Sequence, residues 1–234
     1  MEQGPAGDTS SIRFEGTGPG ARAADGSSVD LYLLLKPQGE PAVVRKRLAP
    51  GDSILELGCG VGRITGPLVQ MGYAVVAVDN SEDMLAFVKG AKTVKANIET
   101  LDLGREFDGV LLMSHLINFP DVSARRALLA TCRRHVAPHG IVIIQRYDPK
   151  WLEDVQVGSL GTLDGIEAFV DSVLHNESTV EMTLRWRTTK ATWTQRFVAQ
   201  SLDDREMKRC LDDAELELEN WLDDRRTWLS ARGR

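Results

Sequence analysis

Short apolar runs alternate with amphipathic stretches between residues 53 and 145 of the chain. The runs are apolar throughout, which is typical of strands that are buried on both faces of a parallel sheet. Apolar residues at helical spacing fill the stretches between them. The predicted strands are residues 53–57, 74–78, 92–96, 109–113 and 141–145, and the predicted helices are residues 41–48, 63–71, 81–89 and 122–136. The pattern predicts a doubly wound α/β fold with a mostly parallel sheet.

The pattern changes in the last third of the chain. Residues 180–188 and 192–201 alternate apolar and polar side chains, and the connection between them is short enough for a hairpin. We therefore expect residues 151–201 to form an antiparallel insertion that covers the ligand edge of the core domain, residues 29–150. Residues 202–234 follow with an amphipathic helix and two strands that complete the core sheet.

The first 28 residues hold six glycines among Ala, Ser, Asp and Pro, and they show no sustained apolar period. Such a composition favours a flexible N-terminal arm, residues 1–28. Tyr32 lies in the apolar run of residues 29–35, directly after this arm.

Composition and charge narrow the class of protein. The 234 residues suit one core, and the net charge of -6 argues against nucleic acid as the main partner. Three widely spaced cysteines exclude a paired disulfide framework and indicate a reducing compartment. No run approaches a membrane span, and the amino terminus lacks a basic region followed by an apolar one. The sequence thus predicts a cytoplasmic protein that binds no membrane.

A glycine-rich loop follows the first strand of the core, where ligands reach the carboxyl edge of an open α/β sheet. The loop runs from Glu56 through Gly58, Gly60 and Gly62, and its glycines let the backbone turn and approach a ligand closely. A dinucleotide fingerprint would place its third glycine where Arg63 stands, and the Gly-Lys-Ser/Thr ending of a phosphate loop is absent. The spacing therefore disfavours a pyrophosphate ligand.

A second acidic residue ends the next strand. Asp79 lies 23 residues after Glu56, and a carboxylate at that place can accept hydrogen bonds from both ribose hydroxyls of an adenosine. Glu56 suits a cationic ligand better than an anionic one, because like charges in a cleft repel each other. S-adenosylmethionine meets both conditions, since it carries an adenosine, an ammonium and a sulfonium but no phosphate.

These residues resemble the first motif of the class I S-adenosylmethionine-dependent methyltransferases, which is an acidic residue followed by x-G-x-G-x-G, with a second acid at the end of strand two. The resemblance covers residues 41–149 well and implies a Rossmann-like core. It implies that the glycine loop lies beside the methionine part of the cofactor and that the second acid holds the ribose. The cofactor-binding residues that it implies are Glu56, Gly58, Cys59, Gly60, Gly62, Asp79, Asn80, Asn97, Ile98 and Ser114. The alternative is a glycine turn without a ligand.

Methyl transfer from a sulfonium needs an oriented nucleophile and, where the nucleophile carries a proton, a base. His115 follows strand four at the edge that holds the glycine loop, and an unperturbed imidazole accepts a proton at neutral pH. We take His115 and Tyr147, which follows strand five, as the catalytic candidates. The alternatives are that His115 caps the sheet edge or stacks near the cofactor, and that Tyr147 only packs.

Four further residues are candidates for substrate contact. Arg146 has a guanidinium fork that pairs with a carboxylate, although Asp148 or a C-terminal acid is an equally good partner. Tyr32 is a candidate lid over the cofactor, and Trp186 and Trp193 are candidate walls of an apolar pocket in the predicted hairpin. Packing alone is the alternative for these three aromatic residues.

The sequence as a whole predicts an S-adenosylmethionine-dependent methyltransferase that acts on a nitrogen or oxygen of a small-molecule metabolite. No pair of histidines has metal-ligand spacing, so we expect no metal. The alternatives are a non-catalytic cofactor-binding regulatory module and a protein or nucleic-acid methyltransferase. Base-modifying relatives carry an Asn/Asp-Pro-Pro-Tyr/Phe motif after strand four, which Asn118-Phe119-Pro120 does not match. We expect a monomer or a homodimer.

Overall fold

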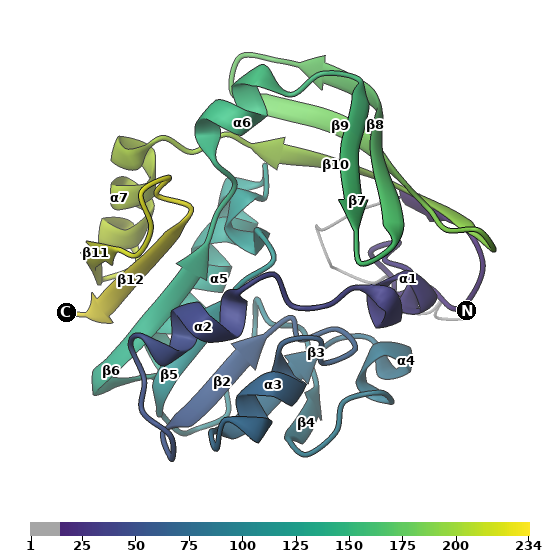
Figure 1. Ribbon diagram of the computed structural model, residues 1–234. Coiled ribbons are helices and arrows are strands. Elements are labelled where there is room, and N and C mark those ends of the chain that lie inside the picture. The colour runs from purple at the N-terminus through teal and green to yellow at the C-terminus, as the bar shows by residue number, and fades with distance from the viewer. Residues whose placement is uncertain (1–14) are drawn as a thin grey trace, which may run out of the picture.

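The computed structural model describes residues 15–234, and these residues form two sheets (Figure 1). The strands of the larger sheet are β2 (Ser53–Leu57), β3 (Ala74–Asp79), β4 (Lys92–Lys95), β5 (Phe107–Leu112), β6 (Val136–Gln145), β11 (Leu216–Trp221) and β12 (Trp228–Gly233). Their order in space is β11-β12-β6-β5-β2-β3-β4. In this order the neighbouring strands β6, β5, β2, β3 and β4 are parallel to one another, and β12 is antiparallel to both of its neighbours. The prediction of a doubly wound, mostly parallel α/β sheet is confirmed.

The start of β6 differs most from the predicted strand boundaries. The predicted strand begins at residue 141, after a helix that ends at residue 136, but β6 begins at Val136 and runs through residues 137–140. The register between β5 and β6 shifts between Phe107 and Gly109, so a bulge absorbs the extra residues. Gly140 permits the close approach of the two strands, because a Cβ there would lie 2.7 Å from the carbonyl oxygen of Phe107.

Helices cover both faces of the larger sheet. They are α2 (Glu40–Arg45), α3 (Thr65–Gln70), α4 (Glu82–Leu85), α5 (Val122–His135) and α7 (Asp204–Asp213), and the other helical elements are α1 (Val29–Leu34), α6 (Pro149–Asp154) and a 3-10 turn at Leu116–Asn118. Residues of α2 and α3 pack on one face, and residues of α5 and α7 pack on the other. α4 is shorter than predicted, and Ser81 caps it by accepting a hydrogen bond from the amide of Met84 (3.3 Å). Within residues 15–234, no helix has both the length and the apolar character needed to cross a membrane.

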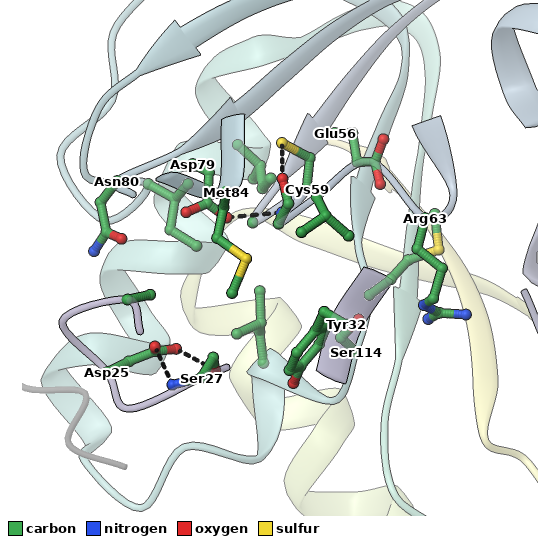
Figure 2. Close-up of a pocket in the computed structure, with 18 of the residues that line it drawn as sticks. Asp25, Ser27, Tyr32, Glu56, Cys59, Arg63, Asp79, Asn80, Met84 and Ser114 are labelled. Atoms are coloured by element: carbon green, nitrogen blue, oxygen red, sulfur yellow. Dashed lines mark hydrogen bonds between the residues drawn. The ribbon is translucent and has the colours of Figure 1, made fainter. Parts of the chain in front are cut away.

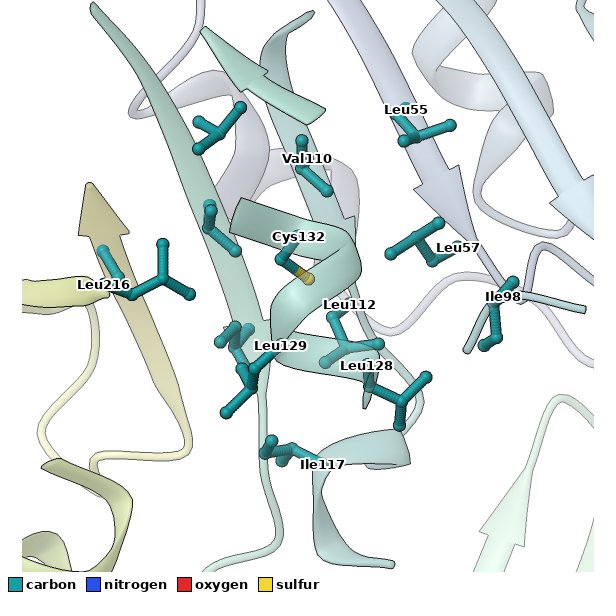
Figure 3. Close-up of a cluster of buried hydrophobic side chains, with 14 of the residues drawn as sticks. Leu55, Leu57, Ile98, Val110, Leu112, Ile117, Leu128, Leu129, Cys132 and Leu216 are labelled. Carbon is teal, nitrogen blue, oxygen red and sulfur yellow. The ribbon is translucent and has the colours of Figure 1, made fainter. Parts of the chain in front are cut away.

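The core between α5 and the larger sheet is built mainly of aliphatic side chains from both (Figure 3). Leu128, Leu129 and Cys132 of α5 belong to the same buried cluster as Leu57 of β2 and Leu112 of β5. All five are at most 1% exposed. Spacings of three and four residues place the helix residues on one face, so the sequence pattern and the packing agree. This core fixes the carboxyl ends of β2 and β5, after which the candidate site residues follow.

The smaller sheet lies over the carboxyl edge of the larger one, and we call it the roof sheet (Figure 1). Its strands are β1 (Glu15–Thr17), β7 (Gly158–Leu163), β8 (Ile166–His175), β9 (Thr179–Arg187) and β10 (Thr192–Gln200). They are antiparallel, in the order β1-β10-β9-β8-β7. The predicted hairpin is confirmed as β9 and β10, whereas the sequence did not predict β7 and β8 as separate strands. Leu152 of α6 packs against the inner face of the roof sheet.

Residues 15–28 differ from the predicted flexible arm because they pack against the roof sheet, and residues 1–14 of that arm lie outside the described residues. The indole nitrogen of Trp193 donates a hydrogen bond to the carbonyl oxygen of Pro19 (3.1 Å). Gly18 makes this contact possible, since a Cβ there would lie 2.4 Å from Cδ1 of Trp193. The glycines that suggested flexibility therefore serve close packing here.

Candidate active site

A cleft opens at the carboxyl edge of β2 and β3 (Figure 2). It holds about 1080 Å³ of empty space, part of it open to solvent, which suits a ligand of nucleoside size. β2 has β3 on one side and β5 on the other, so the strand order reverses there, and open α/β sheets bind ligands at such switch points. The predicted site residues that line the cleft are Tyr32, Glu56, Gly58, Cys59, Gly60, Asp79, Asn80, Asn97, Ile98 and Ser114.

The glycine loop is held by backbone hydrogen bonds at the end of β3. The amides of Gly58 and Cys59 both donate to the carbonyl oxygen of Val78, at 2.9 Å each. The amide of Gly60 donates to Oδ2 of Asp79 (2.8 Å). Gly60 has a φ of +54°, and a Cβ on it would point into open space. The loop therefore presents bare backbone to the cleft.

Gly62 lies outside the lining of the cleft, in contrast to its predicted role in cofactor binding. Its φ is +82°, and a Cβ there would lie 3.2 Å from Cγ2 of Val88. Gly62 instead lets the loop pack against the segment that follows α4. The third glycine of the motif is thus a packing requirement.

Asp79 supports the loop and keeps acceptor capacity for a ligand. Its Oδ1 accepts a hydrogen bond from the amide of Ser81 (2.9 Å), and its Oδ2 accepts the bond from Gly60. A carboxylate has about four lone-pair positions, so both oxygens can accept a further bond. Burial raises the pKa of Asp79, and the charge of Asp25 also raises it, against the lowering effect of the amides of Ser81, Gly60 and Asn80. The ribose contact of Asp79 stays a prediction that this geometry permits.

Glu56 is buried beneath the glycine loop. Only 3% of its surface is exposed, and its Oε2 accepts a hydrogen bond from the hydroxyl of Thr65 (2.6 Å). Burial raises the pKa of Glu56 to about 7, although Thr65 and the charge of Arg63 oppose the rise. Because the carboxyl group is near its midpoint at neutral pH, a cation in the cleft would drive it to the ionised form.

Other predicted cofactor residues contribute different chemistry to the cleft. Oδ1 of Asn97 accepts a hydrogen bond from the backbone amide two residues further on (3.0 Å), which fixes the side chain in a turn. The amide of Ser114 donates to Oε1 of Gln145 (2.9 Å), so the backbone of Ser114 is held at the edge of the cleft. Burial raises the pKa of the Cys59 thiol, which keeps the thiol protonated. An adenine contact by Asn80 or Asn97 stays a prediction.

Sequence reasoning missed Asp25, Ser27 and Arg63, which also line the cleft. Asp25 and Ser27 lie in the glycine-rich segment, whose composition gives no sign of a fixed position. The signal for Arg63 was its place directly after the glycine loop. The guanidinium of Arg63 donates to the carbonyl oxygen of Lys36 (3.0 Å) and pairs with the buried Glu40 (2.7 Å).

Tyr32 lines the cleft from α1. The side chains of Gln195 and Ser27 act on its hydroxyl, and Nε2 of Gln195 in β10 donates a hydrogen bond to Oγ of Ser27 in the N-terminal segment (3.5 Å). Burial raises the pKa of Tyr32, and the charge of Asp25 also raises it. The phenol is therefore neutral at physiological pH and offers a hydrogen-bonding hydroxyl beside the cleft. Its action as a lid stays a prediction.

His115 and Tyr147 meet at a smaller hollow that shares Ser114 with the cleft. Their rings stack with centroids 3.9 Å apart and planes at 6°. Phe197 of the roof sheet walls the same hollow and stacks on Tyr147 at 6.3 Å. Burial and the charge of Arg63 lower the pKa of His115 to about 4. The imidazole is therefore neutral at pH 7 and a weaker base than the sequence alone suggests.

Arg146 belongs to a buried network away from the cleft, so its predicted contact with a substrate carboxylate is wrong. Its side chain is 1% exposed, and the guanidinium lies 4.4 Å from the ring centroid of Trp221. Nε donates to the carbonyl oxygen of Arg226 (2.8 Å), and Nη1 donates to that of Leu202 (2.7 Å). Nη2 pairs with Asp204, a C-terminal acid of the kind that the sequence left open as an alternative. Each of the three guanidinium nitrogens of Arg146 thus donates to a group of the protein.

The two tryptophans of the roof hairpin have different surroundings. Trp193 is 3% exposed, and its indole nitrogen is hydrogen-bonded to the N-terminal segment. Packing therefore accounts for its position, in contrast to its predicted role as the wall of a substrate pocket. Trp186 lies opposite Trp193 in the register of β9 and β10. The indole nitrogen of Trp186 is buried and has no hydrogen-bond partner among the described residues. A role for Trp186 in substrate binding stays a prediction.

Comparison with known families gives this geometry its context. Residues 54–140 match a family model described as a methyltransferase domain. This segment is a methyltransferase domain. The chain is 29% identical over 109 residues to the ubiquinone biosynthesis O-methyltransferase of Bradyrhizobium sp. (strain ORS 278), across 43% of this chain and 42% of that protein. The chain therefore spans about two fifths of the length of the curated relatives it matches.

Solved structures of methyltransferases share the fold. A sugar N-methyltransferase from Streptoalloteichus sp. ATCC 53650 aligns over 100% of both chains with a TM-score of 0.71 and 18% identity. A methyltransferase from Streptomyces caelestis aligns over 85% of this chain and 90% of its own, with a TM-score of 0.71 and 20% identity. At such identities the likeness establishes the fold.

Proposed function

We propose that the protein is an S-adenosylmethionine-dependent methyltransferase that methylates a nitrogen or oxygen of a small-molecule metabolite. The cleft carries this proposal, because bare glycine backbone lies there between the carboxyl groups of Glu56 and Asp79, in a methyltransferase domain. The relatives support a small-molecule acceptor, since they include a ubiquinone biosynthesis O-methyltransferase and a sugar N-methyltransferase.

The residues of the cleft fit this cofactor in charge and in shape. When bound, the cofactor supplies a methyl group on a positively charged sulfur. Asp79 would accept hydrogen bonds from the ribose hydroxyls, and Glu56 would face the cationic amino-acid part. The open space in front of Gly60 leaves room for a ligand against the backbone. Arg63 is held by Glu40, which disfavours a pyrophosphate in the same place.

The acceptor would bind on the side of the roof sheet. We assign residues 29–150 and 202–234 to cofactor binding and to the sheet that supports it, and residues 151–201 to covering the acceptor. Tyr32, Tyr147 and the neutral His115 offer hydrogen-bonding groups of zero charge around Ser114. Because the pKa of His115 is about 4, we assign it to orienting the nucleophile more than to removing its proton.

A product assay tests the proposal. The protein is incubated with S-adenosylmethionine and pools of hydroxylated and amino metabolites, and formation of S-adenosylhomocysteine is measured by mass spectrometry. Product formation with at least one pool is expected. Cofactor binding without product from any pool would favour the non-catalytic alternative, and a protein that does not bind the cofactor would refute the proposal.

The His115→Asn variant then tests the acceptor side. Asparagine tolerates the left-handed backbone of His115, whose φ is +61°, so the loop is expected to keep its shape. Turnover should fall by roughly 10²-fold, because an oriented hydrogen-bonding group is lost, while cofactor affinity by calorimetry should stay unchanged. Tyr147→Phe is the companion variant, since it removes one hydroxyl and keeps the ring stack. Undiminished turnover in both variants would remove these residues from the site.

A further inference from the structure

The lining of the cleft has an excess of negative charge. Asp25, Glu56 and Asp79 all contribute carboxyl groups to it. Among the described residues that line the cleft, Arg63 is the one Lys or Arg, and its guanidinium lies 2.7 Å from Oε1 of Glu40. Since Glu40 is 4% exposed, this buried ion pair balances the charge of Arg63 locally. The three carboxyl groups are therefore left to interact with whatever the cleft binds.

Asp25 is held in place by its own turn. Its Oδ1 accepts a hydrogen bond from the amide of Ser27 (3.0 Å), and its Oδ2 accepts one from the hydroxyl of Ser27 (3.0 Å). The amide of Ala23 donates to the carbonyl oxygen of Ser27 (2.9 Å), which closes the turn. The carboxyl group is thus fixed at the cleft without a basic partner among the contacts of this turn.

Asp25 faces the cleft from the side opposite the glycine loop. Figure 2 shows Asp25 and Ser27 on one side of the cavity and Asp79 and Asn80 on the other. The charge of Asp25 also reaches Asp79 and the hydroxyl of Tyr32, since it raises the pKa of both. A ligand bound between the loop and the N-terminal segment would therefore lie in the field of Asp25.

We propose that Asp25 is a specificity residue that selects the positively charged methyl donor over its neutral thioether product. This inference rests on the proposed function. In methyl transfer the bond between sulfur and the methyl carbon breaks, the nucleophile bonds to that carbon, and the sulfur keeps the electron pair. The donor and the product share the adenosine and the amino-acid groups, so the positive charge on sulfur is what distinguishes them electrostatically.

The position of the sulfur follows from the connectivity of the ligand. Sulfur joins the ribose to the amino-acid part, so it lies between the groups that Asp79 and Glu56 would hold. Asp25 lies across the cleft from the glycine loop, and its charge acts on Asp79 and on Tyr32. The carboxylate attracts the donor and loses that attraction when the methyl group leaves. Asp25 thereby favours exchange of product for donor at the end of each turnover.

The Asp25→Asn variant tests this role by removing the charge while keeping an oxygen that can accept the bond from the amide of Ser27. Affinities for S-adenosylmethionine, S-adenosylhomocysteine and sinefungin are measured by calorimetry; sinefungin carries a protonated amine near the position of the sulfonium. We expect the variant to bind the two cationic ligands roughly five- to tenfold more weakly and the neutral product about as well as the original protein. Raising the salt concentration should reduce the preference of the original protein for the cationic ligands.

Asp30→Asn is the matched control, because Asp30 is an exposed acid of α1 that does not line the cleft. It should leave the ratio of donor to product affinity unchanged. An equal loss of affinity for all three ligands in Asp25→Asn would mean that Asp25 only shapes its turn, and an unchanged ratio would likewise overturn the inference. If the original protein binds none of the three ligands, the proposed function fails, and the inference fails with it.

Discussion

The raised pKa of Glu56 predicts that this buried carboxyl group loses its proton when the cofactor binds. The group is 3% exposed, and burial moves its pKa from 4.5 to about 7. At about 1.36 kcal/mol per pKa unit, ionising Glu56 in the free protein costs about 3 kcal/mol more than in the unfolded chain. A cation bound beside Glu56 offsets this cost, so binding should release a proton.

The sign of the effect on stability follows from the direction of the shift. The folded protein holds the proton of Glu56 to higher pH than the unfolded chain does. The contribution of Glu56 to the free energy of unfolding is therefore fully present below pH 4.5 and is lost as the pH rises through about 7. The Glu56→Gln variant stays neutral at every pH and should keep that stability.

Two measurements check this reasoning. Urea unfolding of both proteins between pH 5 and pH 8 should show the original protein losing about 2 to 3 kcal/mol relative to Glu56→Gln over that range. Calorimetry of cofactor binding at pH 6, in buffers of different ionisation enthalpy, should show that binding to the original protein releases close to one proton. Binding to Glu56→Gln should release none. The affinity of the original protein should rise about tenfold from pH 6 to pH 8, because the ionised fraction of Glu56 rises by that factor.

Parallel stability profiles for the two proteins, together with binding that releases no proton, would refute the account of Glu56. They would mean that the carboxyl group is already ionised in the free protein. Because the comparison is made between two proteins that differ in one buried group, the other titrating residues cancel from the difference.

Two further predictions concern residues on either side of the cleft. Asp79→Ala should weaken cofactor binding at least tenfold by calorimetry, because the loop loses the bond to Gly60 (2.8 Å) along with the predicted ribose acceptor; unchanged affinity would remove Asp79 from the ribose site. Arg146→Ala should lower the free energy of unfolding by about 3 to 5 kcal/mol in urea and leave cofactor affinity unchanged, since it strips a buried charge network; intact stability with impaired binding would restore Arg146 to the site.

The core and the cofactor side of the site could be predicted from sequence because their signals are local. Each parallel strand carries its own apolar run, and each carboxyl end lies at the same edge of the sheet, so Glu56 and Asp79 had to converge once the strands were recognised. The loop between them needed glycine at Gly60, where φ is +54° and the backbone faces the cleft. Residues close in sequence determined that arrangement.

The surroundings of Arg146 and Trp193 depend on contacts between distant segments of the chain, which no local sequence pattern shows. Arg146 follows a strand at the ligand edge, as a substrate anchor would, yet the acceptors that surround it come from residues 56 to 80 positions further along the chain. The packing of the C-terminal elements therefore determined which way the side chain of Arg146 points. The surroundings of Trp193 likewise depend on its hydrogen bond to Pro19, which lies 174 positions away in the chain.

The sequence by itself determined the order of strands and helices in the core, the glycine loop and the two acids beside it, since backbone conformation and apolar period act over a few residues. Only the tertiary structure brought Asp25 and Tyr32 over the cleft and stacked His115 on Tyr147. These contacts join segments that are far apart in the chain. Burial in the assembled fold then set the pKa values of Glu56 and His115, because a carboxyl or imidazole loses water only when distant segments close around it.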